Sequence, residues 1–443
     1  MRRLSKKTVS FRTFGCKQNQ YDTDFLRESF EAEGFTVVDG KAADVVVINT
    51  CAVTSRSAQK CRQAIRAAAK AGSKVVVTGC YPQIASGEVE DLPGVIAVSG
   101  VRDRSRLAEI VAEALETGDK LIRVTPHTPG ESFEDTPVRT PSLTRAFLKI
   151  QEGCGDFCTY CIVPYARGPS RSRPPDSVVK EAESLVRRGY KEIILTGTHI
   201  GLYSGRPGSD GGVDTRFEQH QDLPELIRRV SEIPGLIRLR ISSLEPHDVT
   251  DALIHCLRLP NVCHHLHLPL QSGSDRILKM MGRRYDVPLF IDIIQRARNV
   301  APDLGLTTDL IAGFPGETEE DFQETLAVAK AAGFSRIHAF KYSARPGTRA
   351  HAFPGKVPEK EKEERVKRLI SLGGELSLAF HRKHVGRDME VLIEDDRDKD
   401  GSLAGFTRNY IRCHFQGEDD LKGKVVSVRV TEAAASGVLG DPR

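Results

Sequence analysis

The chain has 443 residues and a net charge of +4, with 39% hydrophobic and 28% charged residues. This composition excludes a disordered or fibrous protein, and the length suggests two to four domains. No stretch approaches the roughly 18 apolar residues of a membrane span. Because no secretory apolar region follows the basic start of the chain, we expect a cytoplasmic protein without membrane contact.

The first 124 residues alternate short apolar runs with helical patterns. Fully apolar runs such as VVVI and VVV are typical of parallel strands that helices cover on both faces. The expected strands lie at residues 9–14, 45–48, 75–77 and 95–98. We therefore predict an α/β domain with a doubly wound parallel sheet over residues 1–124. A linker rich in Pro, Thr, Glu and Asp follows at 125–143.

Residues 144–383 repeat a strand-then-helix rhythm, which predicts a partial (β/α)6 TIM-like barrel. The expected strands lie at residues 146–151, 192–196, 236–242, 264–268, 306–311 and 337–341. A charged helix at 358–383 ends this domain. Four short strands separated by turn residues then predict a small β-barrel over residues 384–443; they lie at 389–394, 403–407, 410–415 and 425–430.

Three cysteines, Cys154, Cys158 and Cys161, follow the first barrel strand with C-x3-C-x2-C spacing. Three thiolates on one short loop can bind three irons of a 4Fe-4S cluster and leave one iron open. S-adenosylmethionine (SAM) can chelate that iron, and a reduced cluster can then cleave SAM to a 5'-deoxyadenosyl radical. The alternative is a zinc or ferredoxin-type site that a distant residue completes. The spacing, with Tyr160 before the last cysteine, favours the radical SAM site.

A second set of cysteines, Cys16, Cys51 and Cys80, ends three predicted parallel strands. The carboxyl ends of such strands gather on one edge of the sheet, where ligands bind, so we predict a second 4Fe-4S cluster there. The alternative is that these residues are small buried hydrophobes. The other cysteines lack this placement, and we expect them to be structural: Cys61, Cys256, Cys263 and Cys413.

Small and polar residues near the ends of the barrel strands are candidates for SAM binding, because ligands bind at these ends. The candidates are Tyr160, Gly197, Thr198, Ser243, Glu245, Gln271 and Gly313. A tight turn is the alternative explanation for residues 197 and 198. His264 and His265 must point to opposite faces of their strand, so we expect the histidines at 264, 265 and 267 to be packed or exposed rather than metal ligands.

Cations without intervening acids occupy residues 56–74, next to Cys51, and can neutralise RNA phosphates. The RNA candidates in this run are Arg56, Lys60, Arg62 and Arg66. A solvated helix face is the alternative. Three further cations follow the cysteine loop, namely Arg167, Arg171 and Arg173. In the tail, the RNA candidates are Arg408, Tyr410 and Arg412, because cations next to an aromatic ring suit RNA binding. The alternative is that these residues only form an exposed face of a strand.

Six segments together resemble the radical SAM methylthiotransferases: TFGCKQNQYDTD, INTCAVTSRSAQKCRQAIR, VTGCYPQ, KIQEGCGDFCTYCIVPYARG, HLHLPLQSGSDRILKMMGRRY and TDLIAGFPGETEEDF. The resemblance covers nearly the whole chain and implies a TRAM-type RNA-binding tail. It also implies that the cysteine loop holds the SAM cluster and that Cys16, Cys51 and Cys80 hold an auxiliary cluster. A long insert at 205–221 departs from the simple strand–helix spacing.

Within that family, three segments most resemble the branch that methylthiolates carbon 2 of N6-threonylcarbamoyladenosine at tRNA position 37: CKQNQYDTD, TCAVTSRSAQK and GFTRNYIRCHF. The resemblance implies tRNA, an electron donor such as flavodoxin or ferredoxin, and a sulfur donor as partners. The rival functions are the same reaction on isopentenyl-type adenosine or on a ribosomal-protein aspartate. A rival of another class is an iron–sulfur RNA-binding protein without catalysis.

Overall fold

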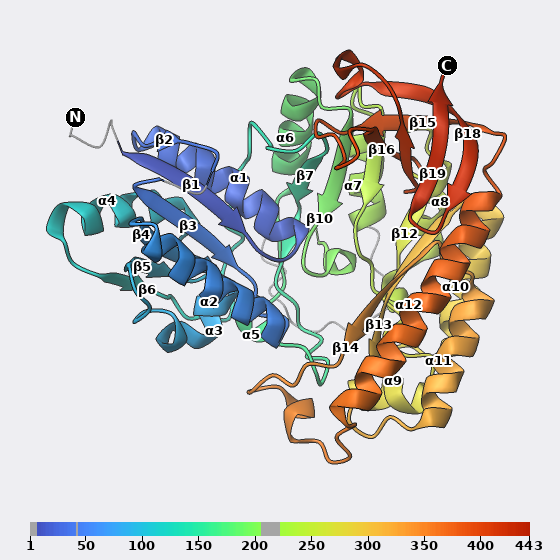
Figure 1. The fold of residues 1–443 in the computed structure, drawn as a ribbon, viewed down its shortest axis with the longest axis horizontal. Coiled ribbons are helices and arrows are strands. Elements are labelled where there is room, and N and C mark those ends of the chain that lie inside the picture. The colour runs from blue at the N-terminus through green and yellow to red at the C-terminus, as the bar shows by residue number, and fades with distance from the viewer. Residues whose placement is uncertain (1–6, 41–42, 205–221) are drawn as a thin grey trace.

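The computed structural model describes residues 7–40, 43–204 and 222–443, so the insert expected at 205–221 lies outside the described residues. Figure 1 shows an N-terminal sheet with its helices in blue, a central domain coloured from green to orange, and a small barrel in red at the C-terminus. None of the described helices is both long enough and apolar enough to span a membrane.

The N-terminal domain is a parallel sheet, as expected, with the strand order β2-β1-β3-β4-β5-β6; the sequence analysis did not predict the short edge strands β2 and β6. Its strands are β1 (Thr8–Thr13), β2 (Thr36–Val37), β3 (Val45–Thr50), β4 (Lys74–Gly79), β5 (Val95–Ser99) and β6 (Leu121–Arg123). Its helices are α1 (Lys17–Ala32), α2 (Ser55–Lys70), α3 (Cys80–Ala85) and α4 (Leu107–Thr117). Along β3, Val46 and Ile48 enter one apolar cluster while Val45 and Val47 enter another. Both faces of the sheet are therefore covered, as the apolar runs predict.

The central domain contains the six expected parallel strands in two groups of three. They are β7 (Ala146–Lys149), β10 (Glu192–Thr196), β11 (Arg238–Ile241), β12 (His265–His267), β13 (Gly305–Ala312) and β14 (Arg336–Lys341). Two isolated bridges, Leu239 with Val262 and Ser243 with His267, connect β11 to β12 and complete the partial barrel. A short hairpin of β8 (Gln151–Glu152) and β9 (Arg171–Ser172) flanks the cysteine loop.

Helices surround this barrel on its outer side, and Figure 1 shows the long helix α12 running beside β14 toward the red barrel. The helices are α5 (Val163–Arg167), α6 (Pro175–Arg187), α7 (Asp222–Ser231), α8 (Asp251–His255), α9 (Asp275–Met281), α10 (Val287–Val300), α11 (Glu319–Ala332) and α12 (Glu359–Arg382). Helix α11 begins with a capping box, in which Thr318 and Asp321 satisfy each other's backbone N–H groups. The expected helix at 358–383 is confirmed as α12.

The tail is a closed barrel in the order β15-β16-β17-β19-β18. Its strands are β15 (Asp388–Ile393), β16 (Leu403–Thr407), β17 (Arg412–Phe415), β18 (Val425–Ala434) and β19 (Gly437–Pro442). The sequence predicts four of these strands and misses β19, because GVLGDP contains two glycines and a proline that are typical of turns. Strand β19 pairs with both β17 and β18 and so closes the barrel. Cys413 lies in the apolar core of this barrel, as expected for a structural cysteine.

Candidate active site

Tight backbone geometry shapes the cysteine loop between β8 and α5. Gly153 adopts a φ of +81°, and a Cβ at this position would lie 1.8 Å from the carbonyl oxygen of Pro169. A turn follows in which the Cys161 N–H donates to the Cys158 carbonyl at 2.9 Å. Phe157, between the first two cysteines, has a φ of +47°, which is unusual for a residue with a side chain. The loop therefore folds back on itself and brings its cysteines together.

The three cysteines of this loop are partly buried and lie close together. Burial raises the pKa of the Cys161 thiol, and the neighbouring charges of Cys158 and Cys154 raise it further. Three thiolates this close repel one another unless a cation binds between them. Soft sulfur ligands of this kind suit iron–sulfur clusters. The residues therefore fit the cluster that the spacing predicts.

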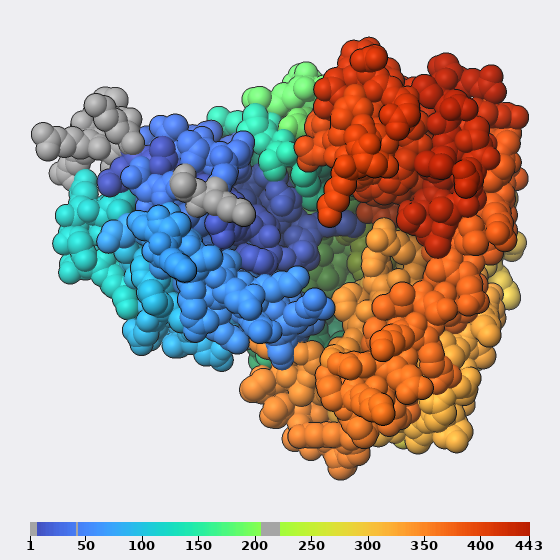
Figure 2. Space-filling view, viewed as in Figure 1, coloured from blue at the N-terminus to red at the C-terminus, as the bar shows by residue number. Residues whose placement is uncertain are grey.

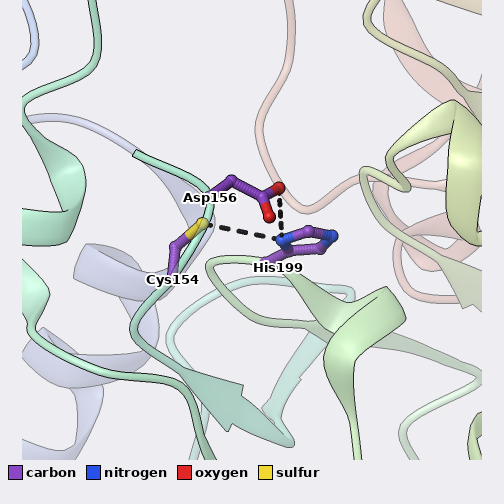
Figure 3. Close-up of side chains that lie close together, drawn as sticks. All are labelled: Cys154, Asp156 and His199. Carbon is purple, nitrogen blue, oxygen red and sulfur yellow. Dashed lines mark hydrogen bonds and ion pairs between the residues drawn. The ribbon is translucent and has the colours of Figure 1, made fainter. Parts of the chain in front are cut away.

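Two cations that the sequence analysis did not single out surround the sulfurs. Arg283 donates to the Cys158 sulfur at 3.3 Å and pairs with Glu245. The Nδ1 atom of His199 lies 3.5 Å from the Cys154 sulfur. Figure 3 shows the Nδ1 atom of His199 directed toward both Cys154 and Asp156, whose carboxylate lies 3.3 Å from Nδ1. His199 directly follows the candidate Thr198 at a strand end, which was a usable signal, whereas nothing local distinguishes Arg283 from its neighbours.

A hydrogen bond fixes the orientation of the His199 ring. Its Nε2 atom lies 2.5 Å from a carboxylate oxygen of Asp248. Burial lowers the pKa of His199, but the hydrogen bonds with Asp248 and Cys154 outweigh it and raise the pKa well above the usual value. His199 can therefore carry a positive charge beside the Cys154 sulfur. Charged donors of this kind tune the electronic properties of a cluster.

The predicted SAM-binding residues divide into two groups. Tyr160 belongs to the cysteine loop, and Glu245 lies beside it, because both interact electrostatically with Cys158. Thr198 accepts a hydrogen bond from the Gly153 N–H at 3.1 Å and donates to Gln18 of α1 at 2.9 Å. These residues therefore surround the site that the loop forms.

Backbone contacts and close packing fix the positions of the remaining SAM candidates. A Cβ at Gly197 would lie 2.9 Å from the carbonyl oxygen of Gln151, so this turn has room only for glycine. Gln271 has a φ of +65° and bridges to Leu310 of β13. Ser243 bridges to β12. Gly313 packs against the side chain of Lys362 on α12. SAM contacts by all seven candidates stay predictions.

The three N-terminal thiols converge at the carboxyl edge of the parallel sheet, directly after β1, β3 and β4. Gly15 has a φ of +111°, and a Cβ there would lie 2.9 Å from the Cys51 Cβ, so the Cys16 loop is pressed against Cys51. Burial raises the pKa of the Cys80 thiol to about 12, and the charges of Cys51 and Cys16 also raise it. The convergence predicted from strand ends is therefore present.

Cys61 lies closer to this site than its place in the sequence suggests. It is fully buried on α2, and its thiol hydrogen-bonds to the backbone of Cys51. Its charge also interacts with Cys80. The approach follows from the start of α2 only four residues after Cys51, because Cys61 lies in the second turn of that helix. We still expect Cys61 to be structural, since its sulfur interacts with the backbone of Cys51.

A buried ionic network joins the two thiol sites. Arg167, after the cysteine loop, hydrogen-bonds to the Cys80 sulfur and pairs with Glu152 at 2.6 Å. Glu152 also pairs with Arg104 of the N-terminal domain at 2.6 Å, and Lys149 pairs with Asp22 of α1 at 2.6 Å. All five side chains are almost completely buried. The network therefore fixes the N-terminal domain against the central domain.

Burial also corrects part of the RNA prediction. Arg167, Arg171 and Arg173 were candidates for phosphate contact, but all three are buried and paired with acids of this chain. Their charge is already neutralised inside the protein. A run of cations in a sequence does not reveal whether distant acids fold against it.

The basic face of α2 remains open to solvent. The helix begins at the N-cap Thr54, whose hydroxyl accepts from the Ser57 N–H, and buries its small apolar side chains against the sheet. Arg56, Lys60 and Arg66 are exposed, and within the described residues no acid pairs with them. Arg62 instead pairs with Glu88 and contacts Tyr81. Three of the four candidates on α2 are therefore free to meet RNA phosphates.

The tail candidates mostly serve the interface between the tail and the central barrel. Arg408 donates to the carbonyls of Pro260 and Val262. Tyr410 stacks on His265 with ring centroids 4.4 Å apart. The prediction of an RNA-facing surface does not fit these two residues, because their side chains attach the tail to the barrel. Arg412 pairs with Asp398 at 2.5 Å on the tail itself.

Buried arginines of the barrel complete this interface. Arg238 donates to the carbonyls of Phe406 and Glu390, and Arg240 donates to that of Thr407. A Cβ at Gly305 would lie 2.0 Å from the Asn409 carbonyl oxygen, so glycine lets the tail loop approach β13. Figure 2 shows a hollow bordered by the blue N-terminal domain, the orange part of the central domain and the red tail.

Comparisons with known proteins agree with this arrangement. Residues 148–329 match the Radical SAM superfamily, residues 8–100 match the Uncharacterized protein family UPF0004, and residues 382–441 match the TRAM domain. A radical S-adenosylmethionine methyltransferase, TsrM, from Kitasatospora setae has a similar fold, with a TM-score of 0.57 and 17% identity. The match covers 78% of this chain and 77% of that chain.

Two curated relatives match over nearly their whole length. The threonylcarbamoyladenosine tRNA methylthiotransferase MtaB of Bacillus subtilis (strain 168) is 40% identical, over 96% of this chain and 94% of the relative. The tRNA-2-methylthio-N(6)-dimethylallyladenosine synthase of Thermoanaerobacter sp. (strain X514) is 36% identical, over 97% of this chain and 91% of the relative. With the cysteine loop, the second set of thiols and the small β-barrel in place, the chain belongs to the radical SAM methylthiotransferase family.

Proposed function

We propose that this enzyme adds a methylthio group to carbon 2 of N6-threonylcarbamoyladenosine at position 37 of tRNA. The observation that carries the proposal is the arrangement of two thiol triads around one domain interface, with Arg167 reaching from the cysteine loop to Cys80. The 40% identity to the Bacillus subtilis MtaB enzyme favours this substrate. The 36% identity to a dimethylallyladenosine synthase makes that adenosine the second candidate.

We infer that Cys16, Cys51 and Cys80 hold an auxiliary 4Fe-4S cluster beside the SAM cluster of Cys154, Cys158 and Cys161. When bound, the first supplies sulfur to the product and the second supplies the electron that cleaves SAM. The chain itself buries Cys51 and Cys80, partly buries the cysteine loop and provides charged donors that stabilise the sulfurs. Arg283 and His199 do so at the cysteine loop, at 3.3 and 3.5 Å.

The cluster assignment predicts iron content. Anaerobically reconstituted enzyme should hold roughly eight irons, as two four-iron clusters. Replacing Cys154, Cys158 and Cys161 together with Ala should leave roughly four irons in the N-terminal domain. Iron analysis together with electron paramagnetic resonance checks both values. Full iron content in the triple variant would contradict the assignment of two separate sites.

Reconstituted enzyme with a chemical reductant and SAM tests the substrate. We expect 2-methylthio product from an anticodon stem-loop RNA that carries N6-threonylcarbamoyladenosine, and none from the same RNA with dimethylallyladenosine. Mass spectrometry of the digested RNA reports both products. Modification of only the dimethylallyl RNA would overturn the proposed substrate. SAM cleavage without modification of either RNA would point to a protein substrate, and no SAM cleavage at all to a binding protein.

We further propose that the exposed cations of α2 bind tRNA phosphates. Replacing Arg56, Lys60 and Arg66 with Gln should weaken tRNA binding and lower the slope of log affinity against log salt by about 2 to 3, because three fewer counterions are released. Binding measured at several salt concentrations checks this result. A matched variant replaces three exposed cations elsewhere, Lys180, Arg187 and Lys330, with Gln. Equal slopes for both variants would show that α2 does not contact RNA.

The electron donor, which we expect to be flavodoxin or ferredoxin, and the sulfur donor belong to this proposal as partners. The same holds for a cytoplasmic location, where tRNA and these donors are available.

A further inference from the structure

A polar group inside the barrel lies apart from both sets of thiols. His267 on β12, Asp309 on β13 and His338 on β14 occupy adjacent strands, and their ligand atoms all lie within 4.8 Å of one another. His267 is oriented by the Thr307 hydroxyl at 2.9 Å and approaches Asp309 at 3.4 Å. The side chains of His267 and Asp309 remain 15% and 30% exposed. The group therefore faces open space rather than the apolar core.

Lys17 extends toward this group from the N-terminal domain. It is the first residue of α1 and directly follows the exposed Cys16. The Lys17 charge affects His338 on β14. Burial lowers the pKa of His338, and the charges of Arg336, His267 and Lys17 lower it further. Lys17 thus directly follows one auxiliary thiol and lies near enough to the barrel to affect His338.

The Lys17 ammonium forms no ion pair with any residue that the structure describes. Among residues 7–40, 43–204 and 222–443, no carboxylate lies within ion-pair distance and no acceptor within hydrogen-bond distance of it. Its nearest charged neighbours include Arg145 and Arg240, which are also cations. Two acidic groups lie near it, Tyr410 and Glu192, but Tyr410 stacks on His265 and Glu192 already pairs with Arg240 at 2.7 Å. A cation in such surroundings is costly unless an anion joins it, so the site is complementary to an anionic ligand.

The threonylcarbamoyl group of the proposed substrate has the matching chemistry. It ends in a carboxylate and also carries a hydroxyl and one N–H group of its own. A dimethylallyl group carries none of these. Asp309 can accept a hydrogen bond from the hydroxyl or an N–H, and a cation can pair with the carboxylate. An acceptor at Asp309 and a cation at Lys17 would therefore distinguish the two modified adenosines.

We propose that Lys17 binds the carboxylate of the threonylcarbamoyl group while Asp309 and His338 contact its polar stem, which makes Lys17 the residue that selects this substrate. The inference rests on the proposed function. It explains how a chain so similar to a dimethylallyladenosine synthase selects a charged adenosine, since a site built for a polar group strongly rejects an analogue that lacks it.

The experiment removes the charge from either partner. Anticodon stem-loop RNA carrying N6-threonylcarbamoyladenosine is compared with the same RNA whose threonyl carboxylate is a methyl ester. For wild-type enzyme, esterification should lower kcat/KM by about 10- to 100-fold, which is the range for a hydrogen bond to a charged group. Lys17→Gln should lower kcat/KM for the acid by a similar factor and show little further loss on the ester. Lys17→Arg should recover most of the activity.

Controls separate this role from damage to the neighbouring cluster site. Lys17→Gln should retain wild-type iron content and reductive SAM cleavage, and Lys330→Gln on the outer helix α11 should behave as wild type. Equal kcat/KM for acid and ester in the wild-type enzyme would overturn the inference while leaving the proposed function intact, and this comparison requires no variant to fold. An additional loss on the ester in Lys17→Gln would also overturn it. No product from either RNA with wild-type enzyme would overturn the proposed function itself.

Discussion

Replacing Cys16, Cys51 or Cys80 with Ala should reduce methylthiolation to background while reductive SAM cleavage survives. The structure separates the two activities, because these thiols end strands of the N-terminal sheet and the SAM cluster loop belongs to the central domain. Cleavage of SAM depends on the cysteine loop alone, whereas insertion of sulfur depends on the auxiliary site. Parallel measurement of 5'-deoxyadenosine and of modified tRNA nucleosides checks the separation.

Cys61→Ala is the matched control for these variants. Cys61 lies beside the same site and is fully buried, so its replacement tests whether mere proximity matters. We expect the Cys61 variant to retain both activities, because its sulfur contacts the Cys51 backbone rather than completing the triad. Loss of auxiliary iron in Cys61→Ala, with retention in Cys51→Ala, would contradict the choice of ligands.

The second large effect should come from Glu152→Gln. Glu152 is fully buried and pairs with Arg167 and Arg104, which belong to different domains, at 2.6 Å each. Removal of its charge leaves buried cations without compensation, which typically costs about 3 to 5 kcal/mol. The central and N-terminal domains should therefore separate more easily. Denaturant unfolding followed by limited proteolysis between the domains measures the loss.

Asp251→Asn provides the comparison for Glu152→Gln. Asp251 pairs with Arg296 at 2.6 Å, but its side chain is 73% exposed. Exposed pairs of this kind contribute about 0 to 1 kcal/mol, so the unfolding curve should hardly change. Similar destabilisation by both substitutions would show that the network around Glu152 does not hold the domains together.

Local patterns predicted most of the fold. Apolar runs located four of the six described parallel strands of the N-terminal domain and the six barrel strands, because both depend on periodicity within a few residues; the short edge strands β2 and β6 have no such run. Strand ends also predicted that Cys16, Cys51 and Cys80 converge, since parallel topology forces their carboxyl ends to one edge. The cysteine loop could be predicted from the spacing of its three cysteines alone.

Contacts between distant segments could not be predicted in this way. Tyr410 and Arg408 have the composition of an RNA surface, yet they pack against the barrel, because a strand pattern does not tell which face of a small barrel meets a neighbour. The pairing of Arg167 with Glu152 and the approach of Lys17 to His338 likewise depend on how whole domains dock. Strand β19 was missed because its glycines and proline resemble a turn.

The nucleosides of tRNA from a strain that lacks this gene test the central claim most directly. Mass spectrometry of digested tRNA should show that 2-methylthio-N6-threonylcarbamoyladenosine disappears and that its unmethylthiolated precursor accumulates. A plasmid with the wild-type gene should restore the product, and one that encodes Cys51→Ala should not. An unchanged level of this nucleoside, with loss of the 2-methylthio form of dimethylallyladenosine instead, would contradict the account.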